Sequence, residues 1–193
     1  MPLPSPSPRT PAEVHLHVVV MGVSGTGKST LARALGTELG LTMGEGDEHH
    51  PPANVAKMAA GHPLDDADRT PWLAALADWT ARRHEAGKGT VLTCSALRRP
   101  YRDVLRAAVP EETLFVHLTG SADVLSSRIT ARMTGREHFM PPSLLESQLR
   151  TLEPLEDDEV GGMVDCDLPL DLVVTDAVTL VRRLSPGGSS GPA

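Results

Sequence analysis

Apolar and polar positions alternate along the chain in a way that predicts strands and helices in turn. Residues 14–21 (VHLHVVVM) form a β-branched run that is typical of a buried strand. Residues 28–39 then place apolar side chains on one face at helical spacing, and Gly40 is suited to end that helix. The first pair of elements is therefore expected to be a strand followed by a helix.

The same alternation continues along the rest of the chain. Further strands are expected at residues 41–43, 90–94, 113–118 and 163–166, and further helices at residues 54–60, 68–86, 99–108, 121–133, 144–152 and 170–184. The polar segment GEGDEHHPP is interpreted as a loop whose prolines stop a helix. Strands that alternate with helices, without hairpin signals, predict a three-layer α/β/α fold with a parallel sheet. Such sheets bind their ligands at the carboxyl ends of the strands.

Composition and charge exclude several classes of protein. The formal net charge is −7, which disfavours nucleic-acid binding because a phosphate backbone requires a clustered basic surface. The chain has only two cysteines, so no disulfide framework is implied, and no apolar run reaches the length of a membrane span. The first residues lack the apolar core of a signal peptide. We therefore expect a cytoplasmic protein without nucleic-acid or membrane partners.

The two ends of the chain are expected to lie outside the folded part. Residues 1–12 hold five prolines and two serines, which favours a disordered tail. Residues 185–193 (SPGGSSGPA) have the composition of a second flexible tail. Residues 13–184 are then expected to form a single domain, which agrees with the usual size of one domain.

Residues 22–29 (GVSGTGKS) match the phosphate-binding pattern G-x-x-x-x-G-K-[S/T] at each defined position. Glycines let the backbone wrap around phosphate groups, and the following helix directs its positive end at the same anion. Lys28 is expected to reach the β- and γ-phosphates of ATP, and the Ser29 hydroxyl to ligate Mg²⁺. A glycine-rich turn without this role is the alternative, and the flanking strand and helix argue against it. The expected ATP-binding residues here are Gly22, Val23, Ser24, Gly25, Thr26, Gly27, Lys28, Ser29 and Thr30.

Other features separate the classes of nucleotide-binding protein. A GTPase would need an N-K-x-D guanine-binding motif, and the only asparagine of the chain is Asn54, in the sequence NVAK. A motor or transporter ATPase usually has an apolar strand that ends in aspartate, whereas two expected strands here lead into Ser95 and Thr119. A kinase that phosphorylates a small molecule is the class that remains.

Such a kinase requires a carboxylate near the acceptor hydroxyl and a cationic lid over the transferred phosphoryl group. Asp47 follows the second expected strand and is the candidate carboxylate, although a loop carboxylate or a helix cap is the simpler alternative. Arg128, Arg132 and Arg136 recur every four residues, so they share a helix face and are candidates for the lid. A solvated helix face is the alternative for these arginines. The lid is expected near residues 133–141.

Several separate segments resemble the gluconokinase family of small P-loop kinases, which are related in fold to shikimate and nucleoside monophosphate kinases. The segments are MGVSGTGKS, EGDEHHPPANVAKMAAGHPLDDADRTPWL, CSALRRPYRDVLR and HFMPPSLLESQLRTLEPLE, in this order. The resemblance covers nearly all of the chain from about residue 14 to residue 184. It implies transfer of the γ-phosphoryl group of ATP to the 6-hydroxyl of D-gluconate with Mg²⁺, and it implies a homodimer.

The resemblance also implies roles for individual residues. Lys28, Asp47 and Arg132 would be catalytic, and Arg128 and Arg132 would also contact ATP. The residues implied for gluconate are Asp47, His50, Arg69, Ser95, Arg98 and His138, with Tyr101 in the same segment as Ser95 and Arg98. The chain departs from the family pattern at Glu137, where glycine is common, and at Thr134-Gly135, which looks like a small insertion.

Simpler interpretations of these residues remain open from the sequence alone. His50 can satisfy the loop that contains it, and Asp66, Asp68 and Arg69 can form a charge cluster at a helix start with Asp68 as N-cap. Trp72, Trp79 and Cys94 are expected to be core residues. The alternative functions are phosphorylation of another acceptor, such as shikimate or a related sugar acid, and nucleotide-dependent regulation without an acceptor.

Overall fold

The computed structural model describes residues 15–133 and 142–185 of the 193 residues. Within these residues the strands are β1 (His17–Met21), β2 (Thr42–Glu45), β3 (Thr90–Thr93), β4 (Thr113–Thr119) and β5 (Gly161–Asp165). The helices are α1 (Lys28–Leu39), α2 (Pro52–Ala59), α3 (Asp66–Glu85), α4 (Arg99–Arg106), α5 (Ala122–Met133), α6 (Pro142–Thr151) and α7 (Leu170–Leu184), with a short 3₁₀ helix, η1 (Gly46–His49), after β2.

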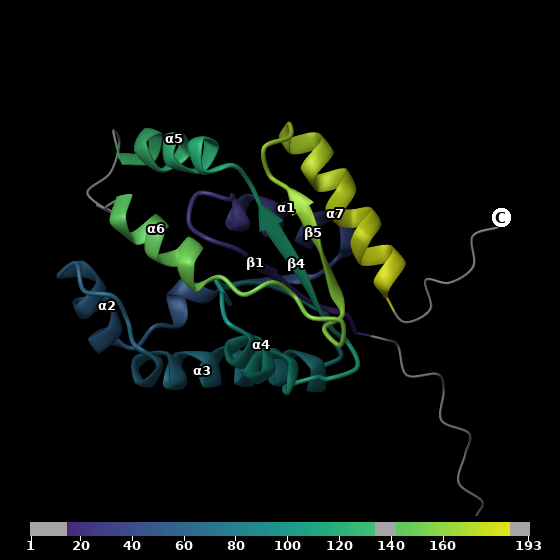
Figure 1. The fold of residues 1–193 in the computed structure, drawn as a ribbon. Helices are drawn as coiled ribbons and strands as arrows, with labels where there is room; N and C mark the ends of the chain where they lie inside the picture. The colour runs from purple at the N-terminus through teal and green to yellow at the C-terminus, as the bar shows by residue number, and fades with distance from the viewer. Residues whose placement is uncertain (1–14, 134–141, 186–193) are drawn as a thin grey trace, which may run out of the picture.

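The strands form one parallel sheet in the order β2-β3-β1-β4-β5. Helices α1 and α7 cover one face and α3 and α4 cover the other, while α5 and α6 lie beyond the arrowheads of the strands (Figure 1). The expected three-layer α/β/α fold is thereby confirmed. Because all the strands are parallel, the loops after β1, β2 and β3 open at the same carboxyl edge of the sheet, where ligands bind in such sheets.

Side chains of β1 alternate between the two layers, as the two-residue period of a strand requires. Val18 and Val20 belong to the buried cluster that contains residues of α1 and α7. Val19 and Met21 belong to the second cluster, which contains Trp72 and other residues of α3. Both faces of the central strand are therefore buried, which explains why residues 18–21 are all apolar instead of alternating with polar residues.

Two expectations about the segment after β2 are wrong. The prolines of GEGDEHHPP do not stop a helix: Pro52 is the first residue of α2, where the missing N–H of proline costs nothing. Asp68 is not the N-cap of α3. Asp65 holds that position, and the two aspartates form a reciprocal capping box, in which the carboxylate of each accepts the backbone N–H of the other at 2.9 Å. The helix consequently starts at Asp66, two residues earlier than expected.

No helix in the described part of the chain is both long enough and apolar enough to cross a membrane.

Candidate active site

The loop between β1 and α1 has the geometry of a phosphate cradle. Gly22, Gly25 and Gly27 have φ values of 137°, 86° and 91°, which side chains with a Cβ rarely adopt. A Cβ on Gly22 would also lie 2.6 Å from the carbonyl oxygen of Leu118. Gly27 caps α1 without a side-chain hydrogen bond, so the first N–H groups of that helix are directed at the loop.

Side chains of the same segment shape the loop. The buried Thr26 hydroxyl donates to the Val23 carbonyl at 2.9 Å, which closes the turn. Lys28 Nζ donates to the carbonyl oxygens of Gly22 and Val23 at 3.0 Å each, so its ammonium group lies over the loop. Ser29 and Thr30 are exposed in the first turn of α1. A hydroxyl beside the phosphate cradle has the chemistry of a Mg²⁺ ligand, so Ser29 fits that role.

The segment after β3 adjoins the phosphate loop. The carbonyl oxygen of Ser95 accepts the N–H of Gly22 at 3.3 Å, and the Ser95 side chain is half-buried. Ala96 is fully buried and has a φ of 44°, which lies in the left-handed region. A residue with a Cβ is less stable in this conformation than in the usual ones. Backbone strain of this kind is often found at functional sites. The turn places Ser95, an expected acceptor-site residue, next to the cradle.

Asp47 and Lys28 lie near the same buried thiol. Burial raises the pKa of Cys94 to about 12, and the charges of Asp47 and Lys28 act on it in opposite directions. Cys94 is therefore an inert core residue at neutral pH, as expected. Asp47 lies in η1, directly after β2, and its carboxylate is 92% exposed. The structure thus brings the candidate carboxylate and the phosphate-loop lysine to one edge of the sheet.

His50 packs against the core beside Asp47. Its ring stacks on Trp72 with centroids 4.2 Å apart, and its Nε2 lies 4.0 Å from Asp47 Oδ1. Burial lowers the pKa of His50; the Asp47 charge opposes this shift, and Arg69 adds to it. Trp72 is a core residue, as expected, and its Nε1 donates to the Gly46 carbonyl at 2.8 Å. The site therefore holds a neutral imidazole next to an exposed carboxylate.

Arg69 and Arg98 converge on Tyr101 from different elements. The two guanidinium carbons lie 5.4 and 5.5 Å from the centre of the Tyr101 ring. Asp66 accepts a hydrogen bond from Arg98 at 2.7 Å and one from the Tyr101 hydroxyl at 2.5 Å. These bonds, first that of Tyr101 and then that of Arg98, lower the pKa of the Asp66 carboxyl. Two guanidinium groups that share one carboxylate form a site suited to a second, external carboxylate.

Asp66 is a site residue that the sequence did not single out beyond a helix-start charge cluster. Its partner Tyr101 lies 35 positions away along the chain, so no local pattern signals the contact. Lys57 bridges Asp65 and Asp68 in the same region, by a hydrogen bond of 3.1 Å to Asp65 and a shorter one to Asp68. This bridge joins α2 to the start of α3 and so fixes the segment that carries Asp66 and Arg69.

Helix α5 supplies Arg128 to the other side of the phosphate loop. Arg128 donates to the carbonyl oxygen of Cys166 at 2.7 Å. It lines a cavity of about 270 Å³ together with Gly25, Thr26, Gly27 and Thr30. Arg128 is therefore positioned beside the segment expected to bind ATP.

The remaining candidates of the lid fall where the structure gives no side chains. Arg132 lies in the last turn of α5, but its side chain is outside the described part. Arg136, Glu137, His138 and the Thr134-Gly135 pair fall in residues 134–141, which also lie outside the described residues. The expected roles of these residues stay predictions.

Helix α6 contributes a residue that the sequence analysis did not identify. The side-chain oxygen of Gln148 accepts the backbone N–H of Ser24 at 2.8 Å. Ser24 belongs to the phosphate cradle, so α6 reaches one of its donors directly. Gln148 lies in the segment SLLESQLRTLEPLE, and a separation of 124 positions hides this contact from any local pattern.

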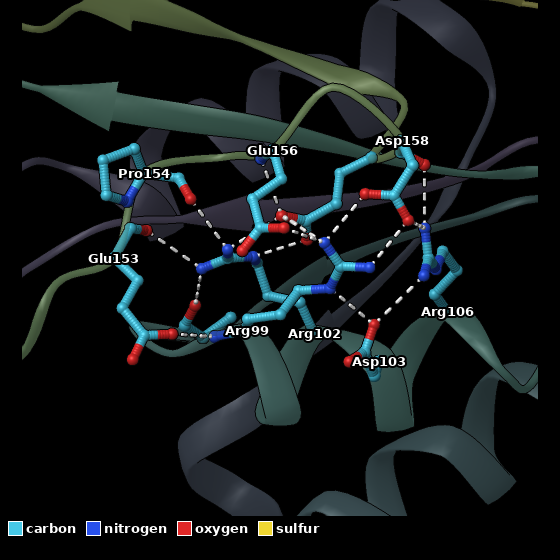
Figure 2. Close-up of polar contacts among 10 residues, drawn as sticks. Arg99, Arg102, Asp103, Arg106, Glu153, Pro154, Glu156 and Asp158 are labelled. Atoms are coloured by element: carbon cyan, nitrogen blue, oxygen red, sulfur yellow. Dashed lines mark hydrogen bonds and ion pairs between the residues drawn. The ribbon is translucent and has the colours of Figure 1, made fainter.

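A cluster of ion pairs and hydrogen bonds around the buried Arg102 anchors the chain that follows α6 (Figure 2). Arg102 of α4 is fully buried and donates to both carboxylate oxygens of Glu159, at 2.6 and 2.8 Å. It also donates to the carbonyl oxygens of Glu153 and Pro154 at 3.0 and 2.9 Å. The backbone N–H of Glu153 bonds to the Leu97 carbonyl at 2.7 Å. The cluster thus ties the end of α6 to the turn that follows β3.

The chain is similar to known proteins over most of its length. A family model described as AAA domain matches residues 18–155. A gluconokinase from Gluconobacter oxydans is 51% identical over 162 residues, which cover 83% of this chain and 88% of that protein. The thermoresistant gluconokinase of Escherichia coli is 40% identical over 170 residues, which cover 88% of this chain and 95% of that protein.

A solved structure agrees with this similarity. The crystal structure of a gluconokinase from Sinorhizobium meliloti superposes with a TM-score of 0.80 at 44% identity, and the match covers 89% of this chain and 94% of that chain. At 44% identity, that protein and this chain are similar in sequence as well as in fold.

Proposed function

The chain belongs to the gluconokinase family, within the AAA domain family, and we propose that it transfers the γ-phosphoryl group of ATP to the 6-hydroxyl of D-gluconate. The observation that carries the proposal is 51% identity to a gluconokinase over 83% of the chain. The chemistry at the carboxyl edge of the sheet supports it, because the phosphate cradle follows β1, and the cationic pair lies in the first turn of α3 and in the segment between β3 and α4. The product is 6-phospho-D-gluconate.

The phosphate loop supplies most of the nucleotide contacts in this proposal. The N–H groups of residues 22–30 surround the β- and γ-phosphates, and Lys28 neutralises charge that moves toward the leaving oxygen. The Ser29 hydroxyl would hold Mg²⁺, which would supply further neutralisation of the phosphate charge. Arg128 and Arg132 of α5 contact ATP from the opposite side. Catalysis then depends mainly on position and charge, as in other phosphoryl transfers.

Asp47 orients the acceptor hydroxyl and accepts its proton. Its exposed carboxylate follows β2, and Lys28 follows β1 on the same edge of the sheet. His50 and Ser95 are the neighbouring groups that can hydrogen-bond to the hydroxyls of a polyol chain. Arg69 and Arg98 bind the gluconate carboxylate, because guanidinium groups match a carboxylate in geometry and charge. His138 is proposed as a further substrate contact from the lid.

The proposal extends to assembly and location. The family resemblance supports a homodimer, which light scattering on the purified full chain tests directly. A cytoplasmic location agrees with a substrate and a nucleotide that are soluble metabolites. The folded part is proposed to span residues 13–184, with a lid near residues 133–141.

The direct test is ADP production by the purified protein with Mg-ATP and different acceptors. We expect a large increase with D-gluconate and none with shikimate, nucleoside monophosphates or no acceptor. The Lys28→Ala variant serves as the control, because loss of the ammonium group should abolish transfer. Increased ADP with a different acceptor alone would show that the substrate is wrong, and acceptor-independent ADP would favour a regulatory nucleotide-binding protein.

A further inference from the structure

Three potential metal ligands converge at the amino end of the sheet, away from the phosphate loop. His17 begins β1, His84 lies in the last turn of α3, and Glu112 directly precedes β4. One ligand atom of each lies within 4.8 Å of the others. At about 3.3 Å per residue of strand, His17 is roughly 15 Å from the start of the phosphate loop. The cluster is therefore separate from the proposed active site.

The cluster holds more acceptors than donors. His84 Nδ1 lies 3.1 Å from His17 Nε2 and 3.1 Å from Glu112 Oε2. A carboxylate oxygen only accepts, and a neutral imidazole carries one proton. Glu112 Oε2 is buried, and its contact with His84 is short but not aligned as a hydrogen bond. A neutral His84 has at most one proton on Nδ1, which cannot be donated fully to both His17 Nε2 and Glu112 Oε2.

The hydrogen bond between His17 Nδ1 and Thr90 favours a tautomer in which His17 Nε2 has a lone pair that faces His84. His17 Nδ1 lies 2.9 Å from Thr90 Oγ1, and both side chains are buried. We assign the proton to Nδ1, which donates to the hydroxyl and leaves Nε2 unprotonated. A ligating histidine is usually held in this way by a hydrogen bond from its other nitrogen.

We propose that His17, His84 and Glu112 form a Zn²⁺ site that stabilises the fold. Zinc binds imidazole nitrogen and carboxylate oxygen at about 2.0–2.2 Å, so adjacent ligands of a tetrahedral site are about 3.3 Å apart. Two of the three separations between ligand atoms are 3.1 Å and match this spacing, and all three atoms lie within 4.8 Å of one another. His84 would hold its proton on Nε2, so Nδ1 becomes a ligand and all three facing lone pairs are satisfied.

Water or His15 would complete the coordination. The His15 ring lies edge-on to His84, with centroids 6.2 Å apart, so His15 is the neighbouring side chain with a further nitrogen donor. Two nitrogens and one carboxylate favour zinc over Mg²⁺, which prefers oxygen ligands and keeps its water. The Mg²⁺ that accompanies ATP should therefore not compete for this site.

The test measures Zn²⁺ binding to the metal-stripped full chain without a histidine tag, in excess Mg²⁺. We expect about one Zn²⁺ per chain by elemental analysis, an increase in Tm on Zn²⁺ addition, and a tetrahedral visible spectrum when Co²⁺ replaces Zn²⁺. Gluconate-dependent ADP release should be unchanged when the metal is removed at a temperature well below Tm.

Substitutions at the proposed ligands distinguish Zn²⁺ binding at this site from Zn²⁺ binding elsewhere on the chain. His84→Gln and Glu112→Gln should weaken Zn²⁺ binding at least tenfold and remove the Zn²⁺-dependent increase in Tm, and Thr90→Val should weaken binding by about 10- to 100-fold. His62→Gln, at an exposed histidine outside the cluster, should bind like the unmodified protein. The proposal is overturned if the unmodified chain binds no Zn²⁺, or if the His84 and Glu112 variants retain its affinity. Circular dichroism without metal shows whether each variant is folded.

Discussion

The side-chain oxygen of Gln148 lies 2.8 Å from the backbone nitrogen of Ser24, so α6 contacts the phosphate loop directly. This N–H is one of the donors that we expect to face the phosphates of ATP. A phosphate oxygen and the Gln148 amide then compete for the same donor. Because α6 begins directly after residues 134–141, where the lid is expected, nucleotide binding and the position of α6 are coupled through this bond.

Two substitutions at Gln148 should therefore have different effects on nucleotide affinity. Gln148→Glu places a negative charge next to the phosphates and should weaken ATP binding at least tenfold, which corresponds to about 1.4 kcal/mol. Gln148→Ala removes the competitor and should leave ATP binding equal or up to about fivefold tighter, the worth of one neutral hydrogen bond. Calorimetric titration with Mg-ATP measures both. Equal affinity in the two variants would contradict the competition.

Asp47 should affect turnover much more than ATP binding. Asp47→Asn keeps the shape but cannot accept the proton of the acceptor hydroxyl, so we expect kcat to fall by about 10²–10⁴-fold. The Kd for ATP should change by less than about threefold, since the phosphate loop provides most of the nucleotide contacts. Glu48→Gln is the matched control, because Glu48 is also exposed in η1. Unchanged turnover of Asp47→Asn would remove Asp47 from the mechanism.

The Arg98 side chain should determine affinity for the acceptor. Arg98→Met removes one guanidinium group from the pair around Tyr101, so we expect the KM for gluconate to rise by about 10- to 100-fold, as for loss of a charge-assisted hydrogen bond. The KM for ATP should stay the same. Arg82→Met is the control, because Arg82 forms an exposed pair with Asp78. A similar rise in both variants would indicate a general effect of charge instead of a specific contact.

Local sequence patterns were sufficient for the parallel sheet and for the phosphate cradle. Runs such as residues 17–21 and the glycine spacing of residues 22–27 act within a few positions, so the sequence contains them directly. The contact of Gln148 with Ser24 spans 124 positions, and that of Tyr101 with Asp66 spans 35. Such contacts depend on how helices pack, and no residue pattern along the chain encodes them. The prolines of GEGDEHHPP were wrongly predicted to stop a helix, because proline disrupts a helix interior but is tolerated at the first helical position, where Pro52 lies.

The buried pair of Arg102 and Glu159 should be important for stability. Arg102→Met leaves the buried Glu159 carboxylate without its main partner, so we expect a loss of about 3–5 kcal/mol in the free energy of unfolding. The double variant Arg102→Met, Glu159→Leu should recover part of that loss, because no unpaired charge remains buried. Urea unfolding of the unmodified protein, the two single variants Arg102→Met and Glu159→Leu, and the double variant measures these values. A double variant less stable than the single one by the full cost of Glu159→Leu would show that the pair does not act as a unit.

His117 should make the fold less stable in mildly acidic solution. The ring lies in β4, is 4% exposed, and has no hydrogen-bond partner on either nitrogen among the described residues. Burial, and then the nearby charge of Arg102, lower the pKa of His117 below its usual value of 6.5. Above about pH 6.5 the ring is neutral in both the folded and the unfolded chain. Below it, the unfolded chain takes up a proton that the folded chain does not, so the free energy of unfolding decreases as pH falls.

Comparison of His117→Leu with the unmodified chain isolates this effect. Removing two unsatisfied buried nitrogens should stabilise the fold by about 1–3 kcal/mol at pH 7.5, where the ring is neutral. The difference in the free energy of unfolding between His117→Leu and the unmodified chain should be larger at pH 5.5. It should increase by at most about 1.4 kcal/mol per pH unit, because one proton is involved. Urea midpoints at both pH values measure the change, with the exposed His62→Leu as control. Some pH dependence should persist in the variant, because burial also lowers the pKa of His50. If the advantage of His117→Leu is the same at both pH values, a buried group other than His117 causes the acid sensitivity.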